Sequence, residues 1–259
     1  MYHSVHALAD RREDPYRITV TPARLDAQLG LLRRHGSRGV SVAELLAARA
    51  AGRDRNLVGL TFDDGYQDFV EQALPLLRKH ACTATVFVLP GRLGGVNAWD
   101  EEGPRKPLLD ADGIRRAADA GMEIASHGLT HTDLARADEA LRHAELVHSR
   151  ALLAELTGRE VRGFCYPYGA VDPDTADAVR RAGYSYGCAI APGPLAGVFA
   201  LPRVYVGRRD TALRLTAKRL LAPLRRPLPA VTPGTARPDA ANASVPAPLL
   251  PPAHTVEAP

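Results

Sequence analysis

Three short polar clusters hold the residues of this sequence whose types and spacing could do chemistry. They are residues 61–65 (TFDDG), 126–131 (SHGLTH) and 166–169 (YPYG). Two imidazoles and one carboxylate can bind Zn²⁺ or another divalent ion and leave positions open for water and substrate. The clusters therefore predict a metal-dependent hydrolase, with a second carboxylate free to act as a base.

The two carboxylates in question are the adjacent Asp63 and Asp64. They should repel each other, and the pKa of one should rise unless a cation or hydrogen-bond donors stabilise both. The alternative is that they cap a helix N-terminus together with Asp68. His127 and His131 can reach one metal from a single turn, although such a pair taken alone is more often a helix-surface pair. These residues do not say which aspartate would bind the metal.

The third cluster would form a wall of the site. Backbone N–H groups near Tyr168 could stabilise a developing oxyanion, whereas the alternative is a simple Pro-Gly turn. The loop at residues 90–109 is long and Gly-rich and carries the only tryptophan, Trp99. We expect this loop to overhang the site.

The elements that must position these clusters alternate between strand and helix. We expect strands at 57–62, 83–89, 122–126, 161–166, 184–190 and 200–206. We expect helices at 21–35, 42–51, 68–80, 110–120, 133–157 and 173–182. This alternation predicts an α/β fold with a parallel sheet. In a parallel barrel the carboxyl ends of the strands share one face, so the three clusters should meet in space.

Composition excludes several other classes of protein. The chain has 259 residues, 46% of them hydrophobic, and no run of 18 apolar residues that would span a membrane. Its net charge of +4 is concentrated in residues 203–226, which is too narrow and too poor in aromatics to favour nucleic acid as a partner. The three cysteines lack CxxC spacing and are expected as buried thiols in a reducing compartment.

The two ends of the chain differ in character from its middle. The start lacks a secretory leader, which predicts a cytoplasmic protein, or an extracytoplasmic one if an upstream leader is missing. Residues 213–226 contain an apolar stripe at helical spacing, expected to pack on the barrel, with weak membrane-surface contact as the alternative. We expect one domain at 1–226 and a disordered Pro/Ala-rich tail at 227–259. The sequence does not indicate an oligomeric state.

The order of the three clusters on successive strands resembles the first three motifs of the polysaccharide deacetylase family, carbohydrate esterase family 4 with its NodB homology domain. The resemblance covers about residues 2–219. Residues 2–5 (YHSV), 18–22 (ITVTP) and 39–41 (GVS) also resemble the branch that includes poly-N-acetylglucosamine deacetylases.

The resemblance implies a distorted (β/α) barrel that removes acetyl groups from N-acetylated sugars, such as oligo- or polysaccharides containing N-acetylglucosamine. It implies that Asp63 is the general base that activates a metal-bound water. It also implies that Asp64, His127 and His131 bind a divalent ion, Zn²⁺ above all. The alternatives are an O-acetyl esterase or a non-peptide amidase with the same site, or a catalytically silent carbohydrate-binding relative.

The chain departs from the family pattern in two places. Cys165 and Tyr166 stand where an Arg often precedes the PYG turn, and the Leu-x-His motif that usually brings the general acid is absent after Gly187. The acid is therefore unassigned, and His3 or a metal-polarised water are the candidates. His3 is expected to end a first barrel strand at the same face as Asp63.

The last expectations concern substrate contacts and one arginine. Pro167, Tyr168, Trp99 and Arg203 are the predicted substrate-binding residues, and Tyr168 is also counted with the catalytic groups. Arg203 is expected close enough to steady Asp63, with a surface Arg at a strand end as the alternative.

Overall fold

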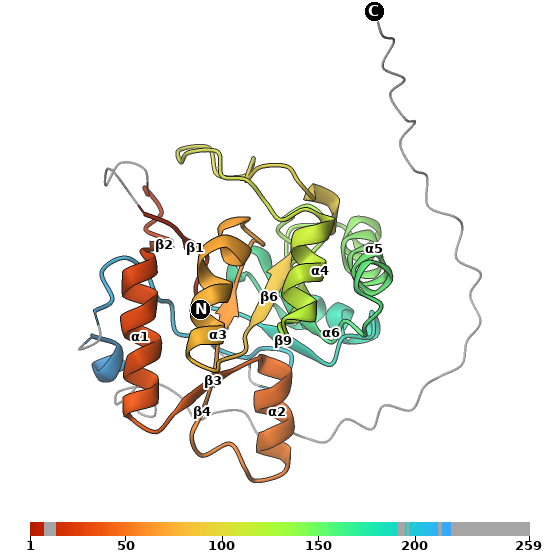
Figure 1. Ribbon diagram of the computed structural model, residues 1–259. Coiled ribbons are helices and arrows are strands. Elements are labelled where there is room, and N and C mark those ends of the chain that lie inside the picture. The colour runs from red at the N-terminus through yellow and green to blue at the C-terminus, as the bar shows by residue number, and fades with distance from the viewer. Residues whose placement is uncertain (8–13, 191–194, 196, 212–213, 219–259) are drawn as a thin grey trace, which may run out of the picture.

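The computed structural model describes residues 1–7, 14–190, 195, 197–211 and 214–218 (Figure 1). Its strands are β1 (Ser4–Val5), β2 (Thr19–Val20), β3 (Arg38–Val40), β4 (Leu57–Gly59), β5 (Thr61–Phe62), β6 (Thr85–Val88), β7 (Glu123–Ser126), β8 (Gly163–Cys165) and β9 (Tyr186–Cys188). Its helices are α1 (Pro22–Arg34), α2 (Val42–Ala50), α3 (Leu74–Lys79), α4 (Ala111–Asp119), α5 (Glu139–Thr157) and α6 (Pro173–Arg181).

Five parallel strands form the central sheet in the order β5-β6-β7-β8-β9, and backbone contacts continue it beyond both edges. On one side Leu201 forms a parallel bridge with β9, and farther along the same segment the amide of Val206 donates to the carbonyl of Met1 at 2.9 Å. On the other side Tyr2 forms a parallel bridge with β5. The edges meet, which confirms the predicted distorted (β/α) barrel.

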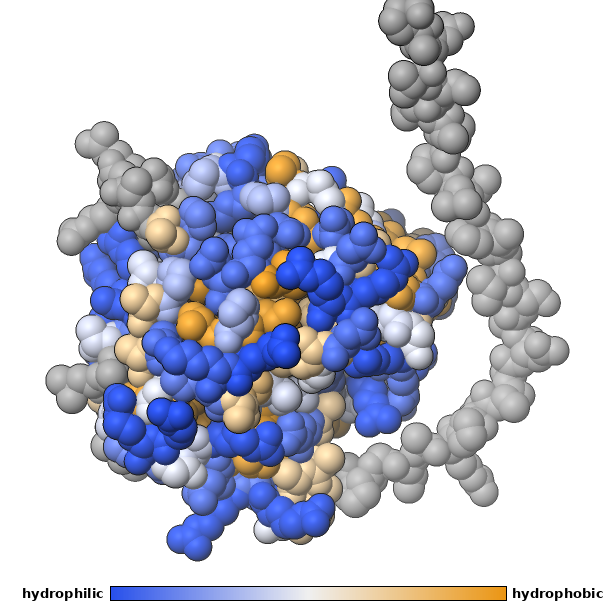
Figure 2. Space-filling model, viewed as in Figure 1, coloured by the Kyte–Doolittle hydropathy of each residue, from blue (hydrophilic) through white to orange (hydrophobic). Residues whose placement is uncertain are grey.

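The helices cover the outside of the ring, and the predicted helix starts are confirmed for several of them. The side chain of Thr21 caps α1 and that of Ser41 caps α2, each by accepting from a backbone amide of the first turn. Polar side chains cover most of the face seen in Figure 2, and apolar side chains are visible between α3 and α4. The apolar sides of these helices pack on a core that includes Phe62, Val86 and Phe164.

The expected strand at 57–62 is in fact two strands in different sheets. β4 pairs with β3, whereas β5 pairs with β6. The change occurs at Leu60, whose amide donates to Val40 at 2.8 Å and whose carbonyl accepts from Thr85 at 2.9 Å. The length of an apolar run shows that a strand is buried, but it does not show where the strand changes partners.

Two expected helices also differ in their bounds. The helix expected at 68–80 begins with a π-helical turn, Phe69–Ala73, ahead of α3, and Pro75, which has no N–H, lies where the two join. The helix expected at 133–157 starts later, at Glu139, because the Asp138 side chain caps it by accepting from the amide of Leu141 at 2.8 Å.

The strand expected at 200–206 is reduced to the single bridge at Leu201. The next residue is Pro202, which cannot donate to a ladder. Part of the expected last helix is described, and residues 214–218 are helical. The rest of that segment, and the expected tail at 227–259, lie outside the described residues.

The three cysteines are free and buried, as expected. Within the part of the chain that the structure describes, no helix is both long enough and apolar enough to cross a membrane.

Candidate active site

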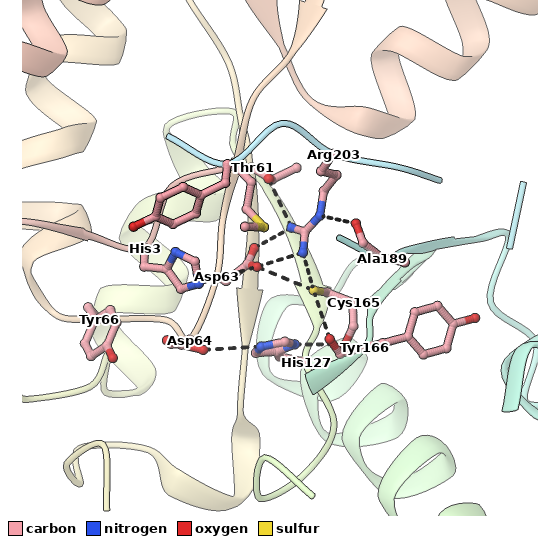
Figure 3. A network of polar contacts seen from close by, with 12 residues as sticks. His3, Thr61, Asp63, Asp64, Tyr66, His127, Cys165, Tyr166, Ala189 and Arg203 are labelled. Carbon is pink, nitrogen blue, oxygen red and sulfur yellow. Dashed lines mark hydrogen bonds and ion pairs between the residues drawn. The ribbon is translucent and has the colours of Figure 1, made fainter. Parts of the chain in front are cut away.

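The adjacent aspartates follow directly on β5, at the carboxyl end of the sheet. The amide of Asp63 donates to the carbonyl of Tyr2 at 3.0 Å, which ties it to the first segment of the ring. Asp64 has a left-handed φ of 70°, and both side chains are buried. Figure 3 shows that the two carboxylates point to different partners, Asp63 toward Arg203 and Asp64 toward His127. Two neighbours in sequence therefore occupy two chemically distinct places.

The carboxylate of Asp64 lies against two imidazoles. Its Oδ1 is 3.2 Å from Nε2 of His127 and 3.4 Å from Nε2 of His131, and the candidate ligand atoms of the three residues lie within 4.8 Å of one another. Nδ1 of His127 is 2.8 Å from the carbonyl oxygen of Cys165, a contact of the kind that orients a ligating imidazole. Two nitrogen donors and one carboxylate fit Zn²⁺ with positions left open.

The spacing of His127 and His131 suggested that both lie on one turn of a helix, but the structure places them in a loop. Residues 127–131 form a loop in which Gly128 has a φ of 85° and His131 a φ of 73°. The loop, and not helical periodicity, brings the two imidazoles together, with ring centroids 5.0 Å apart.

Aromatic rings enclose His131 on two sides. The ring of Trp99 stacks on it, with centroids 4.4 Å apart and planes at 13°. The ring of Tyr168 meets it edge-on at 4.6 Å. Tyr168 is 57% exposed, and Trp99 is partly exposed. These two predicted substrate-binding residues therefore form the accessible rim beside the candidate metal ligands.

The loop that carries Trp99 runs from β6 to α4 and is firmly attached. Asn97 Nδ2 and the hydroxyl of Tyr66 both donate to Asp100 Oδ2, at 2.9 and 3.2 Å. The ammonium group of Lys106 donates to side-chain hydroxyls of β1 and β2, at 2.9 and 2.7 Å. Hydrogen bonds within the loop and to the barrel strands thus hold Trp99 in place beside the site.

Arg203 forms a two-pronged ion pair with Asp63. Nη1 is 2.6 Å from Oδ1 and Nη2 is 2.8 Å from Oδ2. The other N–H groups of the guanidinium donate to the carbonyl of Ala189, the hydroxyl of Thr61 and the sulfur of Cys165. All five N–H groups of the guanidinium are thus committed to protein acceptors. Arg203 therefore steadies Asp63, as expected, and has no donor left for a substrate, while Pro167, the residue before Tyr168, is buried.

A second group of candidate ligands, Asp63, His127 and Cys165, also lies within 4.8 Å. The Arg203 cation contacts both Asp63 and Cys165. A positive charge in that position disfavours a cation there, so the electrostatics favour the Asp64 set.

The partners of the two aspartates determine their protonation. Burial would raise the pKa of Asp63, but the Arg203 charge outweighs burial and lowers it. Burial would likewise raise the pKa of Asp64, but hydrogen bonds from His127 and His131 hold it well below its usual value. The expected rise for one of the pair does not occur, because each carboxylate has its own donors.

His3 lies at the same face as Asp63, with its Nε2 4.0 Å from Asp63 Oδ2. Its side chain is 14% exposed, and no described residue bonds to its buried Nδ1. Burial lowers the pKa of His3, and the charges of Asp64 and Asp63 oppose that effect. An imidazole with a free nitrogen thus lies next to the aspartate pair.

Sequence reasoning missed two residues that contact this site. Tyr66, which is fully buried, hydrogen-bonds Asp100 and neighbours Asp64, and its position directly after the aspartate cluster was a usable signal. Glu145 of α5 bonds the loop that carries the two histidines. Its signal was a charged residue on the buried face of a helix, beside Leu146.

Comparisons with known proteins indicate one family. The family described as polysaccharide deacetylase matches residues 50–187. YxkH of Bacillus subtilis (strain 168) is 26% identical over 211 residues, covering 80% of this chain and 70% of that protein. The poly-beta-1,6-N-acetyl-D-glucosamine N-deacetylase of Staphylococcus aureus (strain MSSA476) is 23% identical over 214 residues, covering 78% and 71%.

Among solved structures, the fold is similar to that of the Streptococcus pyogenes deacetylase PplD in complex with acetate. The TM-score is 0.72 at 23% sequence identity, and the match covers 84% of this chain and 95% of that one.

Proposed function

The chain belongs to the polysaccharide deacetylase family, and from that premise we propose that it removes acetyl groups from N-acetylglucosamine residues of an oligo- or polysaccharide, with a divalent metal ion as cofactor. One observation carries the proposal. A carboxylate that is held by Arg203 lies beside a separate carboxylate that faces two imidazoles. Hydrolysis of an acetamide needs this separation of a base from a metal-ligand set.

Asp64, His127 and His131 are the residues that would hold the ion. When bound, a divalent ion such as Zn²⁺ lowers the pKa of a coordinated water and polarises a carbonyl oxygen. Asp63 accepts the proton of the attacking water. Its lowered pKa keeps it ionised and ready to accept a proton at neutral pH, and the two bonds from Arg203 fix its orientation.

A donor for the developing oxyanion comes from the turn after β8. Pro167 has no N–H, and the amides of Gly169 and Ala170 donate to carbonyls of the turn itself. This leaves the amide of Tyr168, a residue with a left-handed φ of 59°, as the donor that we assign to the oxyanion. The rings of Tyr168 and Trp99 would contact the sugar.

His3 is the group that we assign as general acid for the leaving amine. Its support is the distance of 4.0 Å to Asp63 and the free Nδ1. A metal-polarised water is the alternative donor.

The proposed function is tested by metal analysis combined with acetate release. We expect the purified protein to retain about one divalent ion per chain and to release acetate from N-acetylglucosamine oligomers. Treatment with a chelator should abolish the release, and Zn²⁺ should restore it. Release from O-acetylated sugars alone would identify an esterase. Bound metal without any acetate release would identify a silent binding protein.

Replacing His3 by Gln should lower kcat by about tenfold or more at unchanged metal content, because the leaving amine loses its proton donor. In the wild type, kcat should fall as pH rises through the pKa of His3, since the neutral ring has no proton to give. Burial lowers that pKa, so the fall should begin at lower pH than for an exposed histidine. A pH–rate profile of both proteins is the measurement, and an unchanged profile in the variant would assign the role to water.

A further inference from the structure

The loop between the two histidines needs an external support. Gly128 and His131 both have left-handed φ values, and such a backbone persists for a residue other than glycine only when its surroundings hold it. No helical ladder supplies that hold, because residues 127–131 are outside any helix. Contacts from another part of the chain must therefore hold the two imidazoles close together.

Glu145 of α5 makes the contacts that hold this loop. Its Oε2 accepts from the backbone amides of Leu129 and Thr130, at 2.5 and 3.0 Å. Its Oε1 accepts from the hydroxyls of Thr130 and Thr132, the latter at 2.9 Å. Glu145 is 2% exposed. One buried carboxylate thus uses both oxygens to bind backbone and side-chain groups of residues 129–132, next to and between the two histidines.

The next turn of the same helix face contacts the start of the loop. Ser149 of α5 bonds the hydroxyl of Ser126 at 2.8 Å, and that hydroxyl accepts from the amide of Gly128 at 3.1 Å. Space is tight here, since a Cβ at Gly128 would lie 2.9 Å from Oε2 of Glu145. The helix and the loop are therefore fitted to each other over a complete turn.

We propose that Glu145 is a positioning residue, whose carboxylate clamps residues 129–132 so that His127 and His131 face one metal ion. This inference rests on the proposed function in that it takes the two histidines as metal ligands. It adds that the geometry of the ligand set is imposed from α5 by hydrogen bonding to the loop, and not by the charge of Glu145.

The decisive measurement is Zn²⁺ affinity of the metal-free full chain, by isothermal titration calorimetry at fixed pH. Glu145→Ala removes all four acceptor contacts and should weaken Zn²⁺ binding by about tenfold to a hundredfold, the usual scale for outer contacts of ligands. Glu145→Gln should stay within about threefold of the wild type. Its amide oxygen can accept from the two N–H groups, and the threonine hydroxyls can turn to accept from its NH₂.

Hydrogen exchange of the metal-free proteins gives a readout that does not depend on the ion. The amides of Leu129 and Thr130 should exchange faster in Glu145→Ala than in the wild type and stay protected in Glu145→Gln. If Glu145→Ala does not fold, the double variant Thr130→Val/Thr132→Val replaces it. Both threonines are partly exposed, and losing their hydroxyls should weaken Zn²⁺ binding by about threefold or more.

Leu153→Ala is the matched control for a general loss of stability. Leu153 is buried two turns further along the same face of α5, so its truncation should lower Tm but leave the Zn²⁺ affinity unchanged. The proposed role of Glu145 would be wrong if Glu145→Ala bound Zn²⁺ with wild-type affinity, or if Glu145→Gln and Glu145→Ala lost Zn²⁺ affinity equally. Failure of the wild-type protein to bind Zn²⁺ would instead refute the proposed function.

Discussion

Replacing Asp63 by Asn is expected to lower kcat by at least about a hundredfold while the protein keeps its metal, because a neutral amide cannot accept a proton from the attacking water. The ion should stay, since Asp64, His127 and His131 are unchanged. Single-turnover acetate release and metal content, measured on the same preparation, are the required observations.

Asp64→Asn is the matched variant, one residue away and equally buried. It should weaken metal binding, and activity should recover in part when excess Zn²⁺ is added. If Asp63→Asn lost the metal and Asp64→Asn kept it, the roles assigned to the two aspartates would be reversed.

Replacing His131 by Ala is expected to remove bound metal and activity together. A set of three protein ligands loses affinity steeply when one is deleted, and the loss of the ring also leaves a gap between Trp99 and Tyr168. His127→Ala should have the same outcome. Elemental analysis after dialysis against metal-free buffer measures the effect.

His148→Ala is the control for these two variants, since His148 is exposed on α5 and should retain full metal and activity. Full metal occupancy in either His127→Ala or His131→Ala would exclude the proposed ligand set.

Much of the site's location follows from strand ends, which the sequence makes visible. Asp63, His127 and Tyr168 each follow an apolar run, and parallel strands place such residues on one face. The local sequence also predicted most helix starts, because caps such as Thr21 and Ser41 act over only three residues.

Not every contact that sets the geometry could be predicted in the same way. Arg203 was expected near Asp63, and it pairs with that residue where the two edges of the ring meet, whereas the contact of Glu145 with the histidine loop was not expected. Neither contact leaves a periodic pattern, because each joins segments that become neighbours only in the finished fold. The spacing of His127 and His131 was misleading for the same reason, since the loop between them takes its shape from α5.

The way in which the two edges of the sheet close into a ring has a consequence for the order of folding. Asp63 receives Arg203 from one closing segment and borders His3 on the other, so these contacts span most of the domain and carry a high cost in loop-closure entropy. On a ribosome the N-terminal strands emerge long before residue 203. Until that residue arrives, Asp63 would be a carboxylate without its cation in an apolar barrel, which favours the protonated, inactive form. The segment that carries Arg203 would thus both complete the ring and ionise the proposed base, so chains that have not reached this segment would be catalytically silent.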